Sequence, residues 1–217
     1  FSQKDVVVFH NCENLFHPSK DSLSQDGDFT LEGKKRWTYE RYKKKLNLLA
    51  KTYIATSEGS FPSIIGLCDT PLRKGNYSFI HYNSDDLRGI DVALLYRPSR
   101  FKPIEHYKIT FPASNDAERT RDVLYVNGEM NKTKLHLYVV HAPSRREHNA
   151  KKMLRKSIFD SIYNHIKQLK EKGEENFIIM GDFNDNPWDS SVTKGFHTDS
   201  KQTFLVNLMQ NYKHKAG

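Results

Sequence analysis

The residues best suited to chemistry in this 217-residue chain follow short apolar segments. Asp182 and Asn184 stand in the string Gly-Asp-Phe-Asn, directly after the apolar run 177–180. His141 follows another such run, which ends at Val140. A carboxylate can orient and help to deprotonate an attacking water, a carboxamide can donate to a phosphate oxygen, and a histidine can protonate a leaving group. Asp182, Asn184 and His141 together therefore predict a centre that cleaves phosphate esters.

A second set of polar residues has the oxygen ligands that a hard metal ion prefers. Asn11 and Glu13 follow the first apolar run of the chain, and Asp69 comes directly after another. Sheets commonly present ligands at the ends of their strands, and carboxylates and carboxamides without thiols favour Mg²⁺, Mn²⁺ or Ca²⁺. We expect Asn11, Glu13 and Asp69 to hold Mg²⁺ or Mn²⁺, with no other cofactor.

Arg145 and Arg146 lie just beyond His141 and are candidates for binding the substrate phosphate, because guanidinium groups pair well with phosphate oxygens. Two arginines on a loop are more often solvent-facing or paired with acidic neighbours than bound to a substrate. Each candidate also has a structural interpretation when it is taken alone. Asp182 is a typical turn residue, and His141 is one of ten histidines. The combination of these residues favours the functional interpretation.

The elements that must position these residues are short strands and two amphipathic helices. Buried or alternating apolar runs predict strands over 6–9, 63–68, 77–82, 90–96, 102–110, 123–130, 134–140 and 177–180. Apolar residues at helical spacing predict one helix between Gly33 and Gly59 and another over 154–169, closed by Gly173. This order predicts an α/β protein with mixed sheet structure covered by helices, and it fits neither a repeated barrel nor an all-β sandwich.

The size and composition of the chain bound its class. A chain of 217 residues can bury one substantial core, so we expect a single domain over residues 1–217. No apolar run approaches the roughly 20 residues that span a bilayer, which predicts a chain with no transmembrane segment. Cys12 and Cys68 lack the spacing of a zinc site and are expected to be buried free thiols.

The formal charge of the chain is +8, from 34 Lys and Arg against 26 Asp and Glu. This balance suits a phosphate-bearing partner such as DNA, RNA or an anionic lipid surface, but runs such as 34–36 and 43–45 are also typical of a solvated helix face. We expect a monomer. The residues Phe1-Ser-Gln resemble those around the cleavage point of a secretory signal, which favours a secreted or periplasmic protein. The sequence shows no charged or apolar signal region, so a cytoplasmic location stays open as well.

Five segments resemble, in order, the successive motifs of the endonuclease/exonuclease/phosphatase superfamily. They are Phe9-His-Asn-Cys-Glu-Asn-Leu-Phe16, Ile64-Ile-Gly-Leu-Cys68, Arg88-Gly-Ile-Asp-Val-Ala-Leu-Leu-Tyr96, His141-Ala-Pro-Ser-Arg-Arg146 and Gly181-Asp-Phe-Asn-Asp185. The resemblance runs from about Val6 to Trp188. Gly-Asp-Phe-Asn after an apolar strand is fairly specific to the superfamily, and its agreement in order with the other four segments strengthens the resemblance.

The resemblance implies a four-layer α/β sandwich of the DNase I type, in which two mixed sheets pack face to face with helices outside. By similarity, Asn11 corresponds to an asparagine of the metal or phosphate site, His141 to the catalytic histidine, and Asp182 and Asn184 to the paired residues of the Gly-Asp-x-Asn motif. Members of the superfamily include nucleases, deadenylases, sphingomyelinases and inositol-phosphate phosphatases. The resemblance therefore implies metal-dependent phosphoesterase activity without selecting one substrate.

The chain departs from the superfamily pattern in two places. The superfamily usually has a metal-binding glutamate and a helix after the strand that corresponds to 64–68, whereas the string here continues Asp69-Thr-Pro-Leu-Arg-Lys-Gly-Asn. Either Asp69 replaces the glutamate, or a segment between residues 68 and 69 is left out of the string. We favour the second, because 69–76 is too short and too rich in Pro and Gly to form the helix. Members of the superfamily also end with a strand that is followed by an Asp-His pair. We expect this strand by similarity, but this sequence does not contain it.

Two functions from different classes are compatible with the sequence. The first is a nuclease-like enzyme that hydrolyses a phosphodiester, with DNA or RNA as the substrate. The alternative is a non-catalytic protein with the same fold that binds an anionic polymer. It follows if the sequence truly lacks the metal-binding glutamate and the terminal histidine. A structural domain with no site is a third interpretation, which the ordered motifs disfavour.

Overall fold

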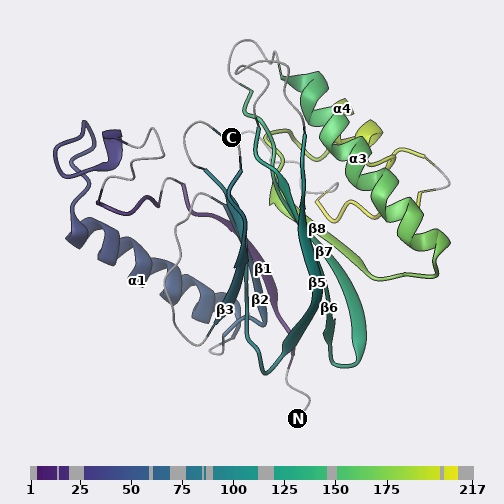
Figure 1. The fold of residues 1–217 in the computed structure, drawn as a ribbon, viewed down its shortest axis with the longest axis horizontal. Coiled ribbons are helices and arrows are strands. Elements are labelled where there is room, and N and C mark those ends of the chain that lie inside the picture. The colour runs from purple at the N-terminus through teal and green to yellow at the C-terminus, as the bar shows by residue number, and fades with distance from the viewer. Residues whose placement is uncertain are drawn as a thin grey trace, which may run out of the picture. The chain divides into compact units, whose positions relative to one another are not determined.

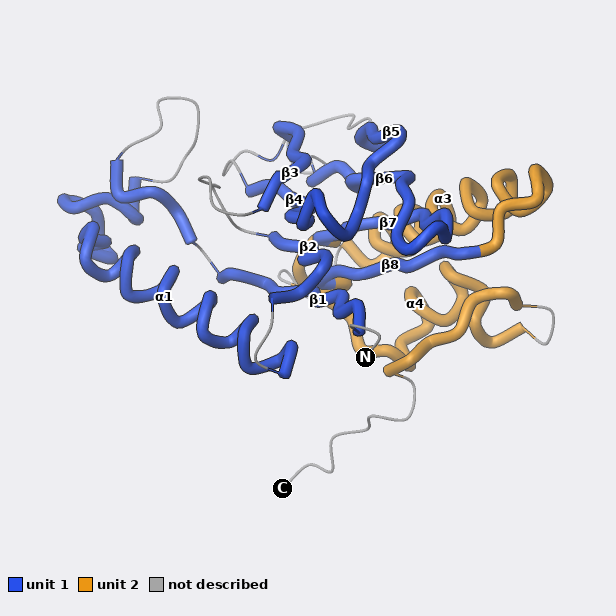
Figure 2. Tube along the Cα trace, turned by 90° about the horizontal axis from the view of Figure 1, so that it is seen from below, with its two compact units in different colours: residues 1–141, 176–182 blue, residues 142–175, 183–217 orange. Residues whose placement is uncertain are grey.

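The computed structural model describes residues 4–13, 15–19, 27–58, 61–68, 77–84, 86, 90–111, 120–145, 151–200 and 203–209. The chain forms two compact units, shown in different colours in Figure 2. The first consists of Phe1–His141 with Asn176–Asp182, and the second of Ala142–Glu175 with Phe183–Gly217. We describe each unit by itself, and the single domain expected over residues 1–217 stays a prediction.

The first unit contains two mixed four-stranded β-sheets (Figure 1). The first sheet has the order β1-β2-β4-β3 and consists of β1 (Val7–Asn11), β2 (Ile64–Cys68), β3 (Ser78–His81) and β4 (Val92–Tyr96). Strands β1 and β2 are parallel, and β4 runs antiparallel to β2 and β3. All five residues of β2 are buried, as expected for a central strand covered on both faces.

The second sheet has the order β5-β6-β7-β8. It consists of β5 (Phe101–Ile109), β6 (Val123–Met130), β7 (Thr133–His141) and β8 (Phe177–Asp182). Strand β6 runs antiparallel to both β5 and β7, whereas β7 and β8 are parallel. Asn131 and Lys132 connect β6 to β7, and their φ angles of 50° and 64° match the twist that a two-residue hairpin turn requires.

The two sheets face each other within this unit, and their facing side chains form its main core. The core consists of Ile64, Cys68, Ile80, Val92 and Leu94 from the first sheet and Phe101, Leu124, Val126, Leu135, Leu137, Val139 and Met180 from the second. Alternate residues of the strands point into this layer, as the period of a β-strand requires. Gly66 allows close packing here, since a β-carbon on it would lie 2.5 Å from Sδ of Met180.

Helix α1 (Tyr39–Thr56) packs on the other face of the first sheet (Figure 1). A second buried cluster joins the two and consists of Cys12, Leu15, Trp37, Tyr42, Ile65 and Leu67. The helix begins later than the predicted start near Gly33, because the hydroxyl of Thr38 accepts a hydrogen bond of 3.2 Å from the backbone N–H of Arg41. This cap marks the start of the helix.

The second unit contains α3 (Lys152–Glu171) and α4 (Ser190–Gly195). The ring of Phe159 on α3 lies 5.4 Å from that of Phe183 and 4.8 Å from that of Phe196, measured between centroids. Gly195 allows α4 to approach α3, because a β-carbon there would lie 2.6 Å from Cβ of Phe159. Helix α3 ends before Gly173, whose φ of 87° is the left-handed conformation typical of a helix end.

The predicted α/β fold class with two mixed sheets is confirmed. Each predicted strand is present with ends that differ by at most two residues, and both predicted helices are present. The sequence pattern does not predict α4 or the 3₁₀ helix η1 (Gly27–Phe29), because both are too short to show helical periodicity. Among the described residues, no helix has the length and hydrophobicity that crossing a lipid bilayer requires.

Candidate active site

The candidate active site lies where strands from both sheets of the first unit end. Strand β1 ends at Asn11, and β7 and β8 end at His141 and Asp182, which are partners in the register of these two strands. Asn11 Nδ2 donates a hydrogen bond of 2.8 Å to Asp182 Oδ2 across 171 positions of sequence. The structure therefore brings together side chains that were predicted from separate segments.

His141 stands beside the same carboxylate. Its Nε2 atom lies 4.0 Å from Asp182 Oδ2, which is close enough for an ion pair and too long for a hydrogen bond. The side chain of His141 is 7% exposed and that of Asp182 is 30% exposed, so the carboxylate is the more accessible of the two groups. A histidine and an accessible carboxylate thus lie side by side at the ends of parallel strands.

The carboxamide of Asn11 is held at both ends. Its Oδ1 accepts a hydrogen bond of 2.8 Å from the backbone N–H of Glu13, which forms a turn directly after β1. Glu13 is exposed and has a φ of 45°, which non-glycine residues rarely adopt, and its carbonyl accepts from Lys45 Nζ at 2.6 Å. The turn directs the Nδ2 group of Asn11 toward Asp182. The metal-binding role of Glu13 stays a prediction.

The oxygen atoms at this point suit part of the shell of a hard divalent cation. Asp182 supplies a carboxylate, and Mg²⁺ commonly binds one or two carboxylates and completes its shell with water and phosphate oxygens. Asn11 presents its Nδ2 group to Asp182 while its Oδ1 accepts from Glu13, so the metal-binding role of Asn11 stays a prediction. No group of three or more His, Cys, Asp or Glu side chains converges within the described residues. Asp69 and Arg146, a predicted metal ligand and a predicted phosphate ligand, lie outside the described residues, as does the whole segment 69–76.

In the second unit, hydrogen bonds join the loops that follow β7 and β8. Asn184 has a φ of 51°, a conformation that asparagine tolerates, and its Nδ2 donates to the carbonyl of Ala142 at 2.9 Å. Arg145 Nε donates to the carbonyl of Asn184 at 3.0 Å and to Asp185 Oδ1 at 2.8 Å, and its Nη2 pairs with Asp189. In this structure the guanidinium of Arg145 binds acidic residues of the neighbouring loop, and its role in phosphate binding stays a prediction.

A buried ion pair that the sequence analysis does not predict stabilises these loops. Arg155 of α3 donates through Nε to Asp185 Oδ2 at 2.6 Å, and the two side chains are 0% and 2% exposed. Burial opposes ionisation of Asp185, but hydrogen bonds from Arg155, Ser191 and Arg145 outweigh it and lower the pKa of this carboxyl below its ordinary value. The signal available in the sequence is the position of Arg155 within the apolar stripe of α3, where a charged residue needs a buried partner.

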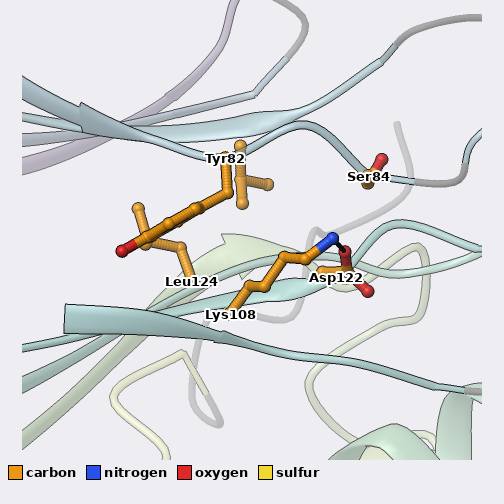
Figure 3. A pocket seen from close by; sticks show the side chains of 6 residues that line it. Tyr82, Ser84, Lys108, Asp122 and Leu124 are labelled. Atoms are coloured by element: carbon orange, nitrogen blue, oxygen red, sulfur yellow. Dashed lines mark ion pairs between the residues drawn. The ribbon is translucent and has the colours of Figure 1, made fainter.

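A small pocket opens near the same end of the second sheet (Figure 3). It has a volume of about 200 Å³, including the part open to solvent, and is lined by Tyr82, Ser84, Val92, Lys108, Asp122 and Leu124. Leu124 pairs with Val139 of β7, two residues before His141. An ion pair of 2.9 Å joins Lys108 Nζ to Asp122 Oδ2, so these two charges neutralise each other. We assign the pocket no role in phosphate binding.

The sequence of the chain matches one protein family over nearly its whole length. Residues 6–217 match the model of the family described as Endonuclease/Exonuclease/phosphatase family. No curated protein matches the chain significantly.

Several solved structures have a similar fold. Humanized D. rerio TDP2 with 14 mutations is 21% identical, with a TM-score of 0.59 over 89% of this chain and 66% of that chain. The catalytic domain of human Nocturnin, with a bound sulfate anion, is 18% identical, with a TM-score of 0.57 over 81% of this chain and 66% of that chain. ANGEL2, a 2′,3′-cyclic phosphatase, is 12% identical, with a TM-score of 0.53 over 70% of this chain and 46% of that chain. The chain therefore spans at most 66% of the length of these proteins, and the likeness shows a shared fold.

Proposed function

The chain belongs to the endonuclease/exonuclease/phosphatase family, and from this membership we propose that it is a metal-dependent enzyme that hydrolyses phosphate esters, chiefly phosphodiesters. One observation carries the proposal. The carboxylate of Asp182 accepts a hydrogen bond of 2.8 Å from Asn11 and lies 4.0 Å from Nε2 of His141. These side chains come from the ends of three separate strands and lie close together. Residues that only cap turns would not need to lie together.

Asp182 is the residue that orients the attacking water and helps to deprotonate it. Its Oδ2 atom is fixed by the N–H of Asn11, and its side chain is 30% exposed, so water can reach the carboxylate. A charged group that is already oriented needs little reorganisation when the reaction takes place. The turn between Asn11 and Glu13 contributes indirectly, because it holds the donor that fixes Asp182.

His141 acts on the charge that develops at the phosphate. A protonated imidazole beside Asp182 neutralises this charge or transfers a proton to the leaving oxygen. Asn184, two residues after Asp182 in the sequence, donates to a phosphate oxygen in this scheme. The contact of its Nδ2 group with the Ala142 carbonyl at 2.9 Å fixes the orientation of the carboxamide.

Mg²⁺ or Mn²⁺ is the cofactor that we propose for this site. Asn11, Glu13 and Asp69 are the predicted ligands of the ion, beside the carboxylate of Asp182. When bound, such an ion polarises a phosphoryl oxygen and lowers the pKa of a bound water. Carboxylate and carboxamide oxygens bind hard ions such as Mg²⁺ and Mn²⁺ in preference to the softer ions that bind thiolates.

DNA and RNA are the substrates that we propose to test first, with the protein acting as a monomer. The formal charge of +8 favours association with a polyanion. Among proteins of similar fold, ANGEL2 is a 2′,3′-cyclic phosphatase, and the Nocturnin catalytic domain binds a sulfate anion. Both observations support a phosphate group as the reactive part of the substrate.

The alternative is a non-catalytic protein that binds an anionic polymer. One observation favours it, because no three metal-ligating side chains converge within the part of the chain that the structure describes. Such a protein would bind DNA with an affinity that falls steeply with salt, and it would not cleave the DNA.

Hydrolysis of bis-p-nitrophenyl phosphate and of plasmid DNA, with Mg²⁺, Mn²⁺ or EDTA, tests the proposal. We expect turnover with one or both metals and none with EDTA. Asp182→Ala should lower the rate about 100-fold or more, because an oriented group at the reaction centre typically contributes this much. DNA binding by the wild-type protein with no cleavage under any condition would support the alternative.

Asp160→Ala is the matched control for Asp182→Ala. The side chain of Asp160 is also 30% exposed, and it forms an ion pair with Lys156 on α3. We expect its activity to stay within about twofold of wild type, because an exposed ion pair contributes little. Equal rates in Asp182→Ala and Asp160→Ala would remove Asp182 from the mechanism.

A further inference from the structure

We propose that Arg155 is a positioning residue whose guanidinium fixes the two loops that follow β7 and β8. The proposal rests on the proposed function, because these loops begin directly after His141 and Asp182 in the sequence. The side chain of Arg155 is 0% exposed, so it acts through the loops and not on the substrate.

The guanidinium of Arg155 contacts both loops at once. On the loop after β8, Nε donates to Asp185 Oδ2 at 2.6 Å and Nη2 donates to Asp185 Oδ1 at 3.1 Å, which is a two-point contact. On the loop after β7, Nη1 donates to the carbonyl of Pro143 at 3.1 Å and to that of Ser144 at 3.3 Å. One planar group therefore binds acceptors from two separate segments of the chain.

Other hydrogen bonds join the same loops, but Arg155 is the buried centre of the network. Ser191 Oγ and Arg145 Nε also donate to the carboxylate of Asp185. The side chain of Arg145 is 46% exposed, so solvent screens its charge. Loss of the Arg155 guanidinium would leave the buried carboxylate of Asp185 without its main partner, whereas loss of Arg145 would not.

The geometry explains why this position needs arginine. Burying an ion pair carries a large desolvation penalty. Replacing such a pair by apolar residues of similar volume often leaves the stability of the protein unchanged. An apolar pair cannot orient loop carbonyls, and a lysine has a flexible stem and no planar fork. Displacement of a catalytic group by about 1 Å can lower a rate about 100-fold. Arg155 therefore supports catalysis through the geometry of the loops that continue the chain directly from His141 and Asp182.

Arg155→Lys tests this inference, because it keeps the charge and removes the fork. We expect kcat on bis-p-nitrophenyl phosphate to fall about 100-fold while KM changes by less than about threefold, at a temperature where circular dichroism shows a folded protein. Ile166→Ala is the control for lost stability, since Ile166 is a fully buried residue of the same helix. The kcat of Ile166→Ala should stay within about twofold of wild type, even if its urea midpoint falls as far as that of Arg155→Lys.

Hydrogen exchange followed by mass spectrometry gives a second measurement that does not require turnover. Arg155→Lys should increase amide exchange in 142–145 and 183–189 by about tenfold or more relative to the rest of the protein. Ile166→Ala should not single out these segments. If Arg155→Lys does not fold, Asp185→Asn should show both effects, because it keeps the shape of the side chain and removes its charge.

Three results would overturn the inference: an unchanged kcat in Arg155→Lys, a loss expressed only in KM, or unchanged exchange in both loops. A wild-type protein that hydrolyses no phosphate ester with any metal would instead refute the proposed function. In that case faster exchange in the two loops of Arg155→Lys would still support the loop-fixing role, and unchanged exchange would exclude it.

Discussion

Gly181 lies so close to Val140 on the neighbouring strand that a β-carbon on Gly181 would overlap the Val140 carbonyl group. The two residues are partners in the parallel register of β7 and β8, and the next pair in that register is His141 and Asp182. Glycine at position 181 therefore lets the strands approach each other directly before the candidate site. Backbone packing accounts for the first residue of the Gly-Asp-Phe-Asn string.

Gly181→Ala should lower both stability and activity, because the strands must move apart to admit the methyl group. We expect the free energy of unfolding to fall by about 1–3 kcal/mol and the hydrolysis rate to fall about tenfold or more. Urea denaturation and the bis-p-nitrophenyl phosphate assay measure the two effects. Gly27→Ala is the control, since a β-carbon there meets nothing within 4 Å. Similar losses in both variants would argue against the strand contact as the cause.

Asn11→Asp should move the pH dependence of activity upward. The variant keeps an oxygen for the N–H of Glu13 and replaces the donor that faces Asp182 at 2.8 Å by a second carboxylate. Two carboxylates this close do not ionise independently, so the pKa of the pair rises. The acidic limb of kcat should shift by about one pH unit or more toward higher pH, measured from about pH 5 to pH 9.

Asn11→Ala separates the loss of the hydrogen bond from the added charge. It removes the donor to Asp182 without introducing a carboxylate, so kcat should fall and the acidic limb should move toward higher pH by less than in Asn11→Asp, because only the hydrogen bond to the ionised carboxyl is lost. An equal shift in Asn11→Ala and Asn11→Asp would contradict the explanation by charge repulsion.

Acid should weaken the protein through Asp185. Hydrogen bonds from Arg155, Ser191 and Arg145 lower the pKa of this carboxyl against the effect of burial, whereas the unfolded chain protonates it near about pH 3.9. Asp185 therefore stabilises the folded state above about pH 4, and this contribution is lost as the pH falls through the lowered pKa. The wild-type urea midpoint should drop as the pH falls below about 4.

Asp185→Asn should be less stable than wild type by about 3 kcal/mol at neutral pH, because the buried guanidinium of Arg155 loses its charged partner. The variant has no carboxyl to protonate at this position, so its urea midpoint should fall less on acidification, and the two proteins should become more similar as the pH falls below about 4. A constant difference across this range would contradict the assigned role of Asp185.

The hydroxyl of Tyr77 should contribute to stability at neutral but not at high pH. It donates to the carbonyl of Pro62 at 2.6 Å, and burial raises its pKa to about 12. A raised pKa means that the contribution is complete below about pH 10 and is lost as the pH rises through about 12. Tyr77→Phe should cost about 1 kcal/mol at neutral pH in urea denaturation. An unchanged midpoint would show that the hydrogen bond is not needed.

The elements of the fold follow largely from local patterns. The strand predicted over 123–130 has the observed ends of β6, because the alternation of its side chains depends on local sequence and ends at the turn of Asn131 and Lys132. The start of α1 was predicted too early. Apolar spacing continues before Tyr39, but the hydroxyl of Thr38 caps the helix and excludes the preceding residues.

The candidate site was predicted in part. Residue type and position after an apolar run identify Asn11, His141 and Asp182 as candidates, because strand ends are visible in the sequence. The ion pair of Arg155 with Asp185 was not predicted. A long charged side chain on an apolar stripe shows that a partner is needed, but it does not show which residue the partner is.

The sequence by itself therefore determined the α/β class, the positions of the strands along the chain and the polar residues at their ends, since burial patterns repeat over a few neighbouring residues. Only the tertiary structure decided that Asn11 reaches Asp182 across 171 positions and that Arg155 binds the two loops that follow β7 and β8 in the sequence. The physical reason is that a hydrogen bond between distant residues depends on which strands and helices become neighbours. That choice is made by the packing of the whole core and is not encoded in any single segment.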